Sequence, residues 1–474
     1  MTTYDLVVLG GGTAGLVAAI GSAGLGASVA LVEQDRPGGD CLWTGCVPSK
    51  SLIAASHAAQ RVRDAHRFGV DAGEPRVDFA RVMRHVHGVI ATIEPHDSAE
   101  RLTAEGVTVL SGRGRFGGPG RIVVASHGAE QEIGYRKALI ATGSTPTLPP
   151  VAGLPAARPL TSDTVWALET LPARLVVIGG GPIGCELGQA FARLGSHVTL
   201  LEAAPRLLIR DLPDAAQIVH DRLIADGVDV RTGVVIDAAV RRADDVVVYL
   251  GGGSTVEADE ILVAAGRAAR TVDLGLDTVS VELTDGGHVQ IDARLRTTAP
   301  RIFAAGDVTG APAFTHVAAY HGGVIVQNAI LGLHRRVSYT VAPAVTYTDP
   351  EVAQIGSQAA DAGDGARVAR FPHSGIDRAI TEGDTSGFTE LVADRKGRLV
   401  GATIVGPAAG EMIAAVAASM RAGARLRDLA GAIHAYPTRS EAIQRAALED
   451  LRASLARYRR PLRSYLALRR LLGR

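Results

Sequence analysis

Short apolar runs that end at glycine or at an acidic residue set the pattern of this chain. Tyr4–Leu9 is such a run; a glycine-rich turn, a stretch of small residues and a second apolar run that ends at Glu33 follow it. The same order returns from Leu175 to Glu202. Apolar runs of this length that alternate with helix-length segments indicate buried parallel strands. We therefore expect an α/β fold with two separate βαβ units.

The pattern changes further along the chain. Leu139–Pro150 predicts a strand closed by a turn rich in Thr, Gly and Pro, which we interpret as a crossing between domains. Another strand runs into a Gly-Asp pair at Arg301–Asp307. From about Val341, strand-like runs flank a helix-like segment at Glu411–Ala422, which indicates a separate α+β domain. The predicted parts are a first dinucleotide domain at residues 1–150, a second at 151–270, a segment returning to the first at 271–340, the α+β domain at 341–450 and a tail at 451–474.

Length, charge and cysteine content restrict the class of protein. The formal net charge of +0 gives no indication of nucleic acid or of an acidic substrate. Three cysteines in 474 residues do not form the disulfide framework of a secreted protein. The first residues run directly into a strand pattern, and no apolar run reaches the length of a membrane span. We therefore expect a cytoplasmic protein that does not bind nucleic acid.

The two glycine-rich turns have the spacing of dinucleotide-binding turns. In the first, Gly10 permits a tight turn, Gly12 lets the backbone approach a pyrophosphate and Gly15 lets helix and strand pack closely. Glu33 ends the second strand, where a carboxylate can accept hydrogen bonds from ribose hydroxyls. The second unit repeats this pattern with Gly179, Gly181, Gly184 and Glu202. One such turn also serves plain packing, but two complete copies predict two dinucleotide sites.

Glu202 also bears on the choice of nicotinamide nucleotide. A carboxylate at this position favours the ribose diol of NAD and repels the 2′-phosphate of NADP. Arg206 and Arg210 follow closely and could reduce that repulsion. We expect NAD(H) to be preferred, with NADP(H) as the alternative.

Cys41 and Cys46 lie five residues apart, just before a helix-like run in which Pro48 is typical of a first helical turn. Such a pair can close a disulfide across the first turn of a helix, where the helix dipole stabilises a thiolate. Thiol–disulfide exchange requires these properties. A metal site and two inert core cysteines are the alternatives, but zinc would require two further ligands, and none lies nearby in the sequence. Cys185 is interpreted as a buried packing residue.

Together these motifs resemble the class I pyridine nucleotide-disulfide oxidoreductases, which include dihydrolipoamide dehydrogenase, glutathione reductase and mercuric reductase. The resemblance extends from Tyr4 to about Ala447. It rests on GGDCLWTGCVPSK, ATGSTP, GGGPIGCE, AAGDVTG, YTDPEVAQIG and PTRSE. It implies two Rossmann-like domains, one for FAD and one for NAD(P), and a C-terminal α+β dimerisation domain. It also implies an obligate homodimer whose subunits share their active sites.

The resemblance implies a role for individual residues. Cys46 would be the charge-transfer thiolate nearest the flavin, and Cys41 the outer thiol that exchanges with the substrate. Lys50 would lie near the flavin and pair with Glu186. FAD would be bound through Gly10, Gly12, Gly15, Glu33, Gly39, Thr142, Gly143 and Asp307. The nicotinamide nucleotide would be bound through Gly179, Gly181, Gly184, Glu202 and Gly266. No metal site is implied.

One departure from the family pattern concerns the acid–base residue. In disulfide-reducing members a His directly precedes the Pro-Thr near the C-terminus and is oriented by the Glu that is Glu441 in this chain; Tyr436 takes its place. A phenol with an ordinary pKa of ~10 is a poor base at neutral pH but can act as an acid. His434 could substitute only if its loop turned inward, and we expect it to pack or to face solvent. Tyr at this place is similar to the mercuric reductase branch, yet no cysteine follows Cys185, whereas mercuric and thioredoxin reductases use C-terminal cysteines.

The expected function is electron transfer from NADH through FAD to the Cys41–Cys46 disulfide and on to a small-molecule disulfide or related acceptor. The first alternative is a flavin-level reductase of quinones or metal ions that does not depend on thiol exchange. The second alternative is a redox-sensing flavoprotein without enzymatic activity, against which two intact dinucleotide turns argue.

The tail at 451–474 interleaves Arg with Leu at roughly helical spacing, and Pro461 interrupts it. This composition predicts a basic amphipathic helix. Such a helix could make a weak contact with an anionic membrane surface, cover the dimer or stand in solvent. Contact with a membrane would favour a lipid-soluble quinone as the acceptor.

Overall fold

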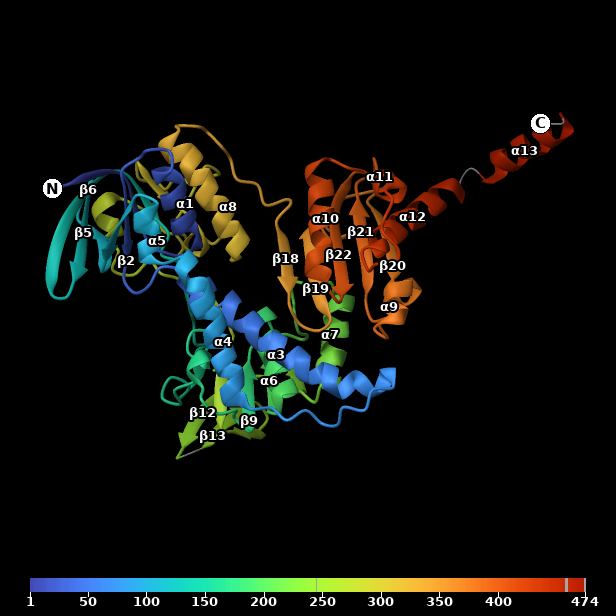
Figure 1. Ribbon diagram of the computed structural model, residues 1–474, viewed down its shortest axis with the longest axis horizontal. Helices are drawn as coiled ribbons and strands as arrows, with labels where there is room; N and C mark the ends of the chain where they lie inside the picture. Colours follow the sequence, from blue (N-terminus) through green and yellow to red (C-terminus); the bar gives the residue numbers. More distant parts are fainter. Residues whose placement is uncertain (244, 457–458, 473–474) are drawn as a thin grey trace. The chain divides into compact units, whose positions relative to one another are not determined.

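The computed structural model describes residues 1–243, 245–456 and 459–472. It divides into two compact units (Figure 1). The nucleotide unit comprises residues 1–205 and 227–338, and the C-terminal unit comprises residues 206–226 and 339–474.

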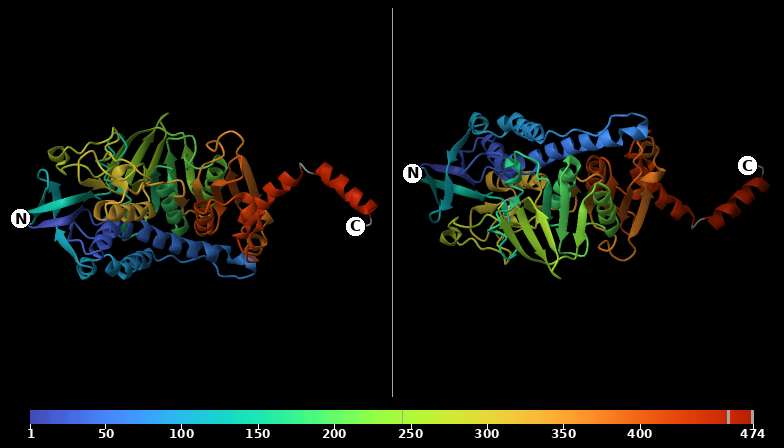
Figure 2. Two further views of the ribbon diagram at one scale, coloured as in Figure 1. Left: turned by 90° about the horizontal axis from the view of Figure 1, so that it is seen from above. Right: turned by 90° about the horizontal axis from the view of Figure 1, so that it is seen from below.

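A seven-stranded sheet forms the first part of the nucleotide unit. Its order is β3-β2-β1-β6-β5-β4, with β17 beside β6. The strands are β1 (Thr3–Leu9), β2 (Val29–Glu33), β3 (Val107–Ser111), β4 (Arg113–Phe116), β5 (Arg121–Ser126), β6 (Ala129–Ile140) and β17 (Ile302–Ala304). Strands β1, β2, β3, β6 and β17 run parallel, whereas β4 and β5 are antiparallel additions. Both views of Figure 2 show the N-terminal strand beside the hairpin of β5 and β6.

The register of this sheet brings the ends of its parallel strands together. Leu9 is paired with Val32 and with Ile140, and Ile140 is paired with Ala304. The residues that follow these strands therefore meet at the carboxyl edge, where ligands bind in sheets of this kind.

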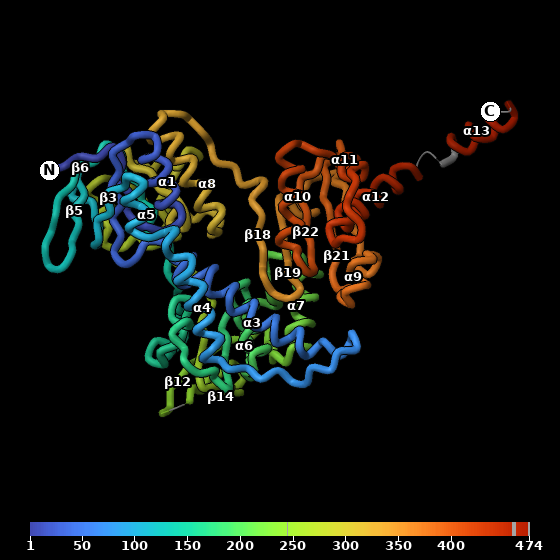
Figure 3. Tube along the Cα trace, viewed as in Figure 1, coloured from blue at the N-terminus to red at the C-terminus, as the bar shows by residue number. Residues whose placement is uncertain are grey.

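Helices α1 (Thr13–Ala23) and α8 (Thr315–Ile325) cover one face of the sheet. They pack against Leu6, Val8, Leu31 and Leu139, whereas Val7 and Leu9 belong to the core on the other face, as the two-residue period of a strand requires. The Cα trace shows α1 and α8 side by side although they are far apart in the sequence (Figure 3). The other helices of this part are α2 (Gly39–Trp43), α3 (Cys46–Asp64), α4 (Phe79–Ile93) and α5 (Ala99–Ala104).

A second sheet, of five parallel strands in the order β11-β10-β9-β15-β8, carries the second βαβ unit. Its strands are β8 (Leu160–Thr161), β9 (Arg174–Ile178), β10 (His197–Glu202), β11 (Asp229–Thr232) and β15 (Glu260–Val263), and α6 (Pro182–Leu194) connects β9 to β10. A three-stranded antiparallel sheet and a two-stranded ribbon complete the unit. They consist of β12 (Ile236–Arg242), β13 (Asp245–Leu250) and β14 (Thr255–Ala258), and of β7 (Ser144–Pro146) and β16 (Arg267–Ala269).

The C-terminal unit is built on an antiparallel sheet in the order β18-β19-β22-β21-β20. These strands are β18 (Pro343–Thr346), β19 (Glu351–Gly356), β20 (Arg367–Pro372), β21 (Phe388–Ala393) and β22 (Leu399–Gly406). The helices are α7 (Pro213–Ala225), α9 (Asp377–Thr381), α10 (Ala409–Arg421), α11 (Leu426–Gly431), α12 (Glu441–Ala456) and α13 (Arg459–Leu471). Leu391 and Ile404 of the sheet pack with Val416 of α10 and Ala446 of α12 in one core.

The predicted α/β fold with two βαβ units and a C-terminal α+β part is confirmed. The predicted domain boundaries stay predictions. Pro461 was expected to interrupt the tail helix, but it lies in the first turn of α13, where proline is tolerated. Residues 457, 458, 473 and 474 of the predicted tail lie outside the described residues. Among the described helices, none has the length and apolar character that crossing a membrane requires.

Candidate active site

The first glycine turn separates glycines that pack from a glycine that leaves space. Gly10 has φ +107°, and a Cβ atom there would lie 2.4 Å from the carbonyl oxygen of Ala141. A Cβ at Gly15 would lie 2.0 Å from the carbonyl oxygen of Gly10. At Gly12 the nearest atom would be the Cα of Gly39, 3.9 Å away. The packing of the turn therefore requires glycine at positions 10 and 15. Gly12 instead leaves space in which a ligand can approach the backbone at the N-terminus of α1.

The second turn repeats this arrangement. A Cβ at Gly179 would lie 2.5 Å from the carbonyl oxygen of Ala264, and one at Gly184 would lie 1.8 Å from that of Gly179. A Cβ at Gly181 would meet no atom within 4 Å. Gly12 and Gly181 are the N-cap residues of α1 and α6, and neither helix has a side-chain cap. Both helix N-termini therefore present backbone N–H groups that suit a pyrophosphate.

The acid at the end of each second strand holds its turn in the same way. Glu33 accepts hydrogen bonds from the backbone N–H of Gly11, at 2.6 Å, and of Asp35, at 2.9 Å. Glu202 accepts them from Gly180, at 2.5 Å, and from Ala204, at 2.6 Å. The two units thus have equivalent geometry, and the residues present fit two dinucleotides.

The other predicted nucleotide-binding residues lie beside the two turns. Gly39 packs so closely on the first turn that a Cβ atom there would lie 2.6 Å from the Cα of Gly12. The Thr142 hydroxyl donates to the carbonyl oxygen of Arg270 at 2.7 Å, and the Arg270 N–H donates to that of Gly143 at 3.0 Å. The Ser144 hydroxyl donates to Asp307 Oδ2 at 2.7 Å. Gly266 has φ +145° and follows β15, at the carboxyl edge of the second sheet.

The cysteine pair spans two helices. Cys46 is the first residue of α3 and Pro48 lies in the same turn, but Cys41 belongs to the separate short helix α2. The expectation that the pair lies across the first turn of one helix is therefore wrong. Thr44 and Gly45 separate α2 from α3, so the two cysteines lie on different helices. Both cysteines are thiols, and Cys46 Sγ lies 3.3 Å from Thr315 Oγ1. Cys185 is fully buried, as expected.

The two thiols differ in acidity. The hydrogen bond from Cys41, helped by Thr315 and the Lys50 ammonium, lowers the pKa of the Cys46 thiol to about 6 against the opposing effects of burial and Glu186. The same hydrogen bond raises the pKa of the Cys41 thiol, and burial and the Asp97 carboxylate add to the increase. At neutral pH the pair therefore holds one thiolate, on Cys46, and one thiol, on Cys41.

Lys50 and Glu186 connect the cysteine helix to the second βαβ unit. Lys50 Nζ lies 2.7 Å from Glu186 Oε2, and Glu186 is a buried residue of α6. Because the carboxylate is almost inaccessible to water, it needs a cationic partner. The ion pair therefore fixes a positive charge close to the first turn of α3.

Sequence reasoning missed a cluster of charges around Arg267. Its guanidinium forms an ion pair with Asp40, the neighbour of Cys41, and donates to the hydroxyls of Ser144 at 2.8 Å and Ser162 at 3.1 Å. Arg270 Nη1 lies 3.4 Å from Asp40 Oδ1. Since Ser144 also bonds Asp307, Arg267 connects helix α2 with a predicted FAD-binding residue. Asp40 within the cysteine motif was the available sequence signal.

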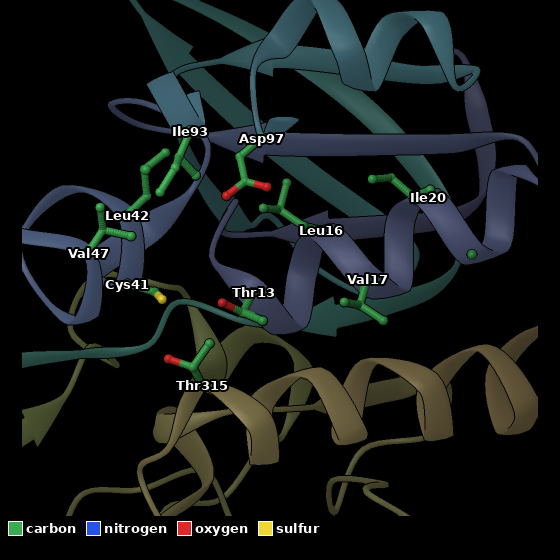
Figure 4. Close-up of a pocket in the computed structure, with 11 residues that line it drawn as sticks. Thr13, Leu16, Val17, Ile20, Cys41, Leu42, Val47, Ile93, Asp97 and Thr315 are labelled. Atoms are coloured by element: carbon green, nitrogen blue, oxygen red, sulfur yellow. The ribbon is translucent and has the colours of Figure 1, made fainter. Parts of the chain in front are cut away.

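A pocket of about 570 Å³ opens beside Cys41 (Figure 4). Most of its wall is apolar, from Leu16, Val17 and Ile20 of α1 and from Leu42 and Ile93. Thr13, Thr315 and Asp97 supply polar groups. Cys41 lines this pocket and Cys46 does not, so a ligand there reaches the thiol that the sequence predicts to be the outer one.

Tyr436 and Glu441 lie in the C-terminal unit. The Tyr436 side chain is 68% exposed, and its hydroxyl donates to Asp377 Oδ2 at 2.7 Å. This hydrogen bond raises the pKa of the phenol. Glu441 is buried, and its Oε1 accepts a hydrogen bond from Arg445 Nε at 2.8 Å. His434 is half-buried. Among the described residues, no group of three His, Cys, Asp or Glu side chains could hold a metal ion.

Comparisons with known proteins agree with this geometry. Residues 4–322 match the family model of pyridine nucleotide-disulphide oxidoreductases, and residues 342–447 match the dimerisation domain of the same family. A dihydrolipoyl dehydrogenase from Geobacillus stearothermophilus is 38% identical, over 94% of this chain and 95% of its own length. A mercuric reductase from Streptomyces lividans is 36% identical, over 94% and 96%.

Two solved structures are similar over most of their length. LpdA from Mycobacterium tuberculosis has a TM-score of 0.86 and 29% identity, over 94% of this chain and 99% of that one. The Cu(II) complex of the HOCl-induced flavoprotein disulfide reductase RclA from Escherichia coli has a TM-score of 0.84 and 29% identity, with the same coverage.

The predicted enzyme class is thereby confirmed, with FAD and a pyridine nucleotide as its cofactors and a homodimer as its assembly. Two nucleotide turns, a thiol pair of unequal acidity and a dimerisation domain are combined in one chain. This chain belongs to the pyridine nucleotide-disulphide oxidoreductase family.

Proposed function

We propose that the protein uses NADH to reduce a compact, uncharged disulfide at Cys41. FAD, which the turn Gly10–Gly15 at the N-terminus of α1 would hold, would supply the two-electron chemistry between the reduced nicotinamide and the Cys41–Cys46 disulfide. The observation that carries the proposal is the asymmetry of the pair: Cys41 lines an accessible pocket, while Cys46 is held by Thr315 at the N-terminus of α3.

The chain's own residues divide the work between the two thiols. The N-terminus of α3, the Lys50 ammonium and the Thr315 hydroxyl keep Cys46 as a thiolate. Glu186 holds Lys50 in place. Cys41 attacks the acceptor from the pocket, and Cys46 then displaces the product by re-forming the disulfide.

The pocket wall supports an acceptor without negative charge. Its apolar residues would bury hydrocarbon, and the Asp97 carboxylate would repel an anionic disulfide. A cyclic disulfide on a neutral hydrocarbon chain, such as lipoamide, meets both conditions. Glutathione disulfide, which carries several carboxylates, does not.

The nucleotide turn supports NADH as the electron donor. Glu202 keeps its carboxylate at the turn through the N–H groups of Gly180 and Ala204. The Arg206 guanidinium donates to the carbonyl oxygens of Leu207, Leu208, Ile209 and Asp211. These bonds engage Arg206 within its own loop, so it is poorly placed to neutralise a 2′-phosphate.

The role of Glu202 can be tested with Glu202→Ser. This variant should lower kcat/KM for NADH about tenfold and reduce the preference of the enzyme for NADH over NADPH. Steady-state kinetics with both nucleotides measure the change.

The test of the proposed function is NADH oxidation with lipoamide, glutathione disulfide and a soluble quinone as acceptors. Wild-type protein and the Cys41→Ser and Cys46→Ser variants are compared, with Cys185→Ser as the matched control. We expect lipoamide turnover that both pair variants lose and the control retains. Lipoamide turnover that survives both pair variants would contradict the proposal.

A flavin-level reductase of quinones or metal ions is the second candidate. Tyr436, bonded to Asp377, stands where disulfide-reducing relatives carry a His, and similar proteins include a mercuric reductase and a reductase solved with Cu(II). This candidate predicts quinone or metal reduction that persists in Cys46→Ser. In that case the activity of this chain would be similar to that of the mercuric reductase branch rather than the dihydrolipoamide dehydrogenase branch.

The dimer and the tail complete the proposal. Tyr436 and Glu441 of the dimerisation domain would act on the Cys41 pocket of the partner subunit, where a phenol can give a proton but not take one at neutral pH. We also infer a cytoplasmic location, because three cysteines in 474 residues do not form the disulfide framework of a secreted protein. Helix α13 exposes Leu462, Leu466 and Leu468 beside its arginines, which suits weak contact with an anionic membrane surface. Binding to vesicles that contain an anionic lipid, lost on removal of residues 457–474, would support that contact.

A further inference from the structure

The pocket beside Cys41 contains a carboxylate that the predicted catalytic set does not include. Asp97 follows the 3-10 turn Glu94–His96 and precedes Ser98, the N-cap of α5. In Figure 4 its carboxylate turns into the space that Cys41 and Thr315 border from the other side. Leu16, Leu42 and Ile93 surround that space. Of the described residues that line the pocket, Asp97 alone carries a carboxylate.

Asp97 and Cys41 influence each other's protonation. Burial raises the pKa of the Asp97 carboxyl, and the neighbouring His96 imidazole acts against this increase. The charge of Asp97 in turn raises the pKa of the Cys41 thiol. Cys41 and His96 are the titratable groups that act on or respond to Asp97. Each negative charge disfavours the other, so one proton is readily held by the pair.

Cys41 needs such a partner if it exchanges with a disulfide. The thiolate and not the thiol is the nucleophile, so the proton of Cys41 must be accepted by a base. The hydrogen bond to Asp377 raises the pKa of the Tyr436 phenol, so the phenol keeps its proton at neutral pH and cannot accept that of Cys41. Cys46 must remain a thiolate in order to close the disulfide afterwards. Asp97 is already in the pocket where the acceptor would bind.

We propose that Asp97 accepts the proton of Cys41 during disulfide exchange and returns it to the leaving thiolate. The inference rests on the proposed function, because it assigns a proton carrier to that reaction. A general acid–base of this kind acts directly or through one water molecule and contributes roughly 10²–10⁴-fold to the rate.

The step balances without a further oxidant or reductant. The Cys41 thiol gives its proton to Asp97 as its sulfur forms a bond to one sulfur of the acceptor, and the acceptor's S–S bond breaks. The leaving thiolate takes the proton from Asp97. The Cys46 thiolate then attacks Cys41 Sγ, which re-forms the Cys41–Cys46 disulfide and releases the second product thiolate, which is protonated by water. The enzyme pair is oxidised by two electrons and the acceptor is reduced by two.

The experiment compares FAD-loaded wild type with Asp97→Asn, and Glu94→Gln serves as the matched control. Glu94 is an exposed carboxylate three residues away that does not line the pocket. NADH-reduced protein is mixed rapidly with lipoamide, and reoxidation is followed. Alkylation of Cys41 by iodoacetamide is measured at pH 8 in a Cys46→Ser background, with and without Asp97→Asn.

The two rates are expected to change in opposite directions. Asp97→Asn should slow reoxidation by lipoamide about 100-fold because the proton carrier is lost. It should accelerate alkylation because removal of the charge lowers the pKa of Cys41. Reduction by NADH should be unchanged, and Glu94→Gln should match wild type in each measurement.

Three outcomes would overturn the inference. Reoxidation of Asp97→Asn within about twofold of wild type would show that no proton passes through Asp97. Faster reoxidation together with faster alkylation would make Asp97 an electrostatic neighbour only. Wild-type protein that NADH reduces but lipoamide does not reoxidise would overturn the proposed function first, and this inference with it.

Discussion

At the scale of single residues, the surroundings of each thiol determine its role. Cys46 stands at the first turn of α3, close to Thr315 and to the ammonium of Lys50. Cys41 stands in a largely apolar pocket with a carboxylate. The charges near Cys46 therefore favour a thiolate and those near Cys41 favour a thiol. One side chain is kept ready to close the disulfide, and the other is kept for the acceptor.

The Lys50–Glu186 ion pair provides a test of this explanation. The pKa of Cys46 is lowered by Lys50 and raised by Glu186. Relative to the parent protein with the same background, Lys50→Met should therefore raise the pKa of Cys46, and Glu186→Gln should lower it. The pH dependence of Cys46 alkylation, in a Cys41→Ser background, measures both shifts. Shifts in the same direction would show that the pair acts through its position rather than its charges.

At the scale of elements, the nucleotide unit depends on the close packing of α1 and α8. A Cβ atom at Gly322 of α8 would lie 2.7 Å from Val17 Cβ and 2.9 Å from the carbonyl oxygen of Ala14. The two helices begin at Thr13 and Thr315, and both of these residues line the Cys41 pocket. Any change in helix spacing therefore alters the pocket.

Two neighbouring glycines of α8 make this dependence measurable. Gly322→Ala forces its methyl group against the backbone of α1 and should lower the free energy of unfolding by about 1–3 kcal/mol. Gly323→Ala meets no atom within 4 Å, so it should leave stability unchanged or raise it by up to about 1 kcal/mol. Denaturant unfolding of both variants gives the comparison. Equal changes in the free energy of unfolding would mean that helix propensity, rather than packing against α1, determines the effect of these substitutions.

At the scale of the whole molecule, each compact unit contains a buried neutral imidazole. Burial lowers the pKa of His321 in the nucleotide unit to about 4, and it lowers that of His373 in the C-terminal unit to about 4. His321 Nδ1 accepts the N–H of Gly306, next to Asp307, at 3.1 Å. Protonation of His321 would break that hydrogen bond. Acid should therefore lower the stability of the nucleotide unit and also disturb the segment that carries Asp307.

The sign of this pH dependence follows from the two pKa values. Between pH ~6.5 and ~4 the unfolded chain binds protons that the native imidazoles do not, so stability falls as the pH falls, by about 3 kcal/mol for each His. His321→Asn keeps an acceptor for Gly306 but cannot be protonated. Thermal unfolding between pH 7.5 and 4.5 should therefore be less acid-sensitive in this variant than in wild type. The exposed His127→Asn serves as the control, and an unchanged acid dependence in His321→Asn would refute the explanation.

The sequence was sufficient for features that lie close together along the chain. The glycine turns, their acids and the thiols each occupy a short segment whose residue spacing sets the local geometry, as with Gly10, Gly12 and Gly15. It was insufficient for contacts between distant segments. Arg267 and Asp40 are 227 positions apart, and the position of Asp97 beside Cys41 depends on how a turn after α4 packs. Neither follows from periodicity, because tertiary packing alone brings these groups together.

The equivalence of the two nucleotide turns has a consequence for the history of the chain. Gly179, Gly181, Gly184 and Glu202 follow Gly10, Gly12, Gly15 and Glu33 at a constant separation, and both acids bond the N–H of the residue after the first glycine. Such agreement in both spacing and bonding is what duplication of one ancestral βαβ segment would leave. Helix α3 lies outside the repeated pattern and contacts the second copy through the Lys50–Glu186 ion pair. Duplication would therefore supply the two nucleotide turns, and the thiol pair would be a separate addition to a scaffold that already carried both.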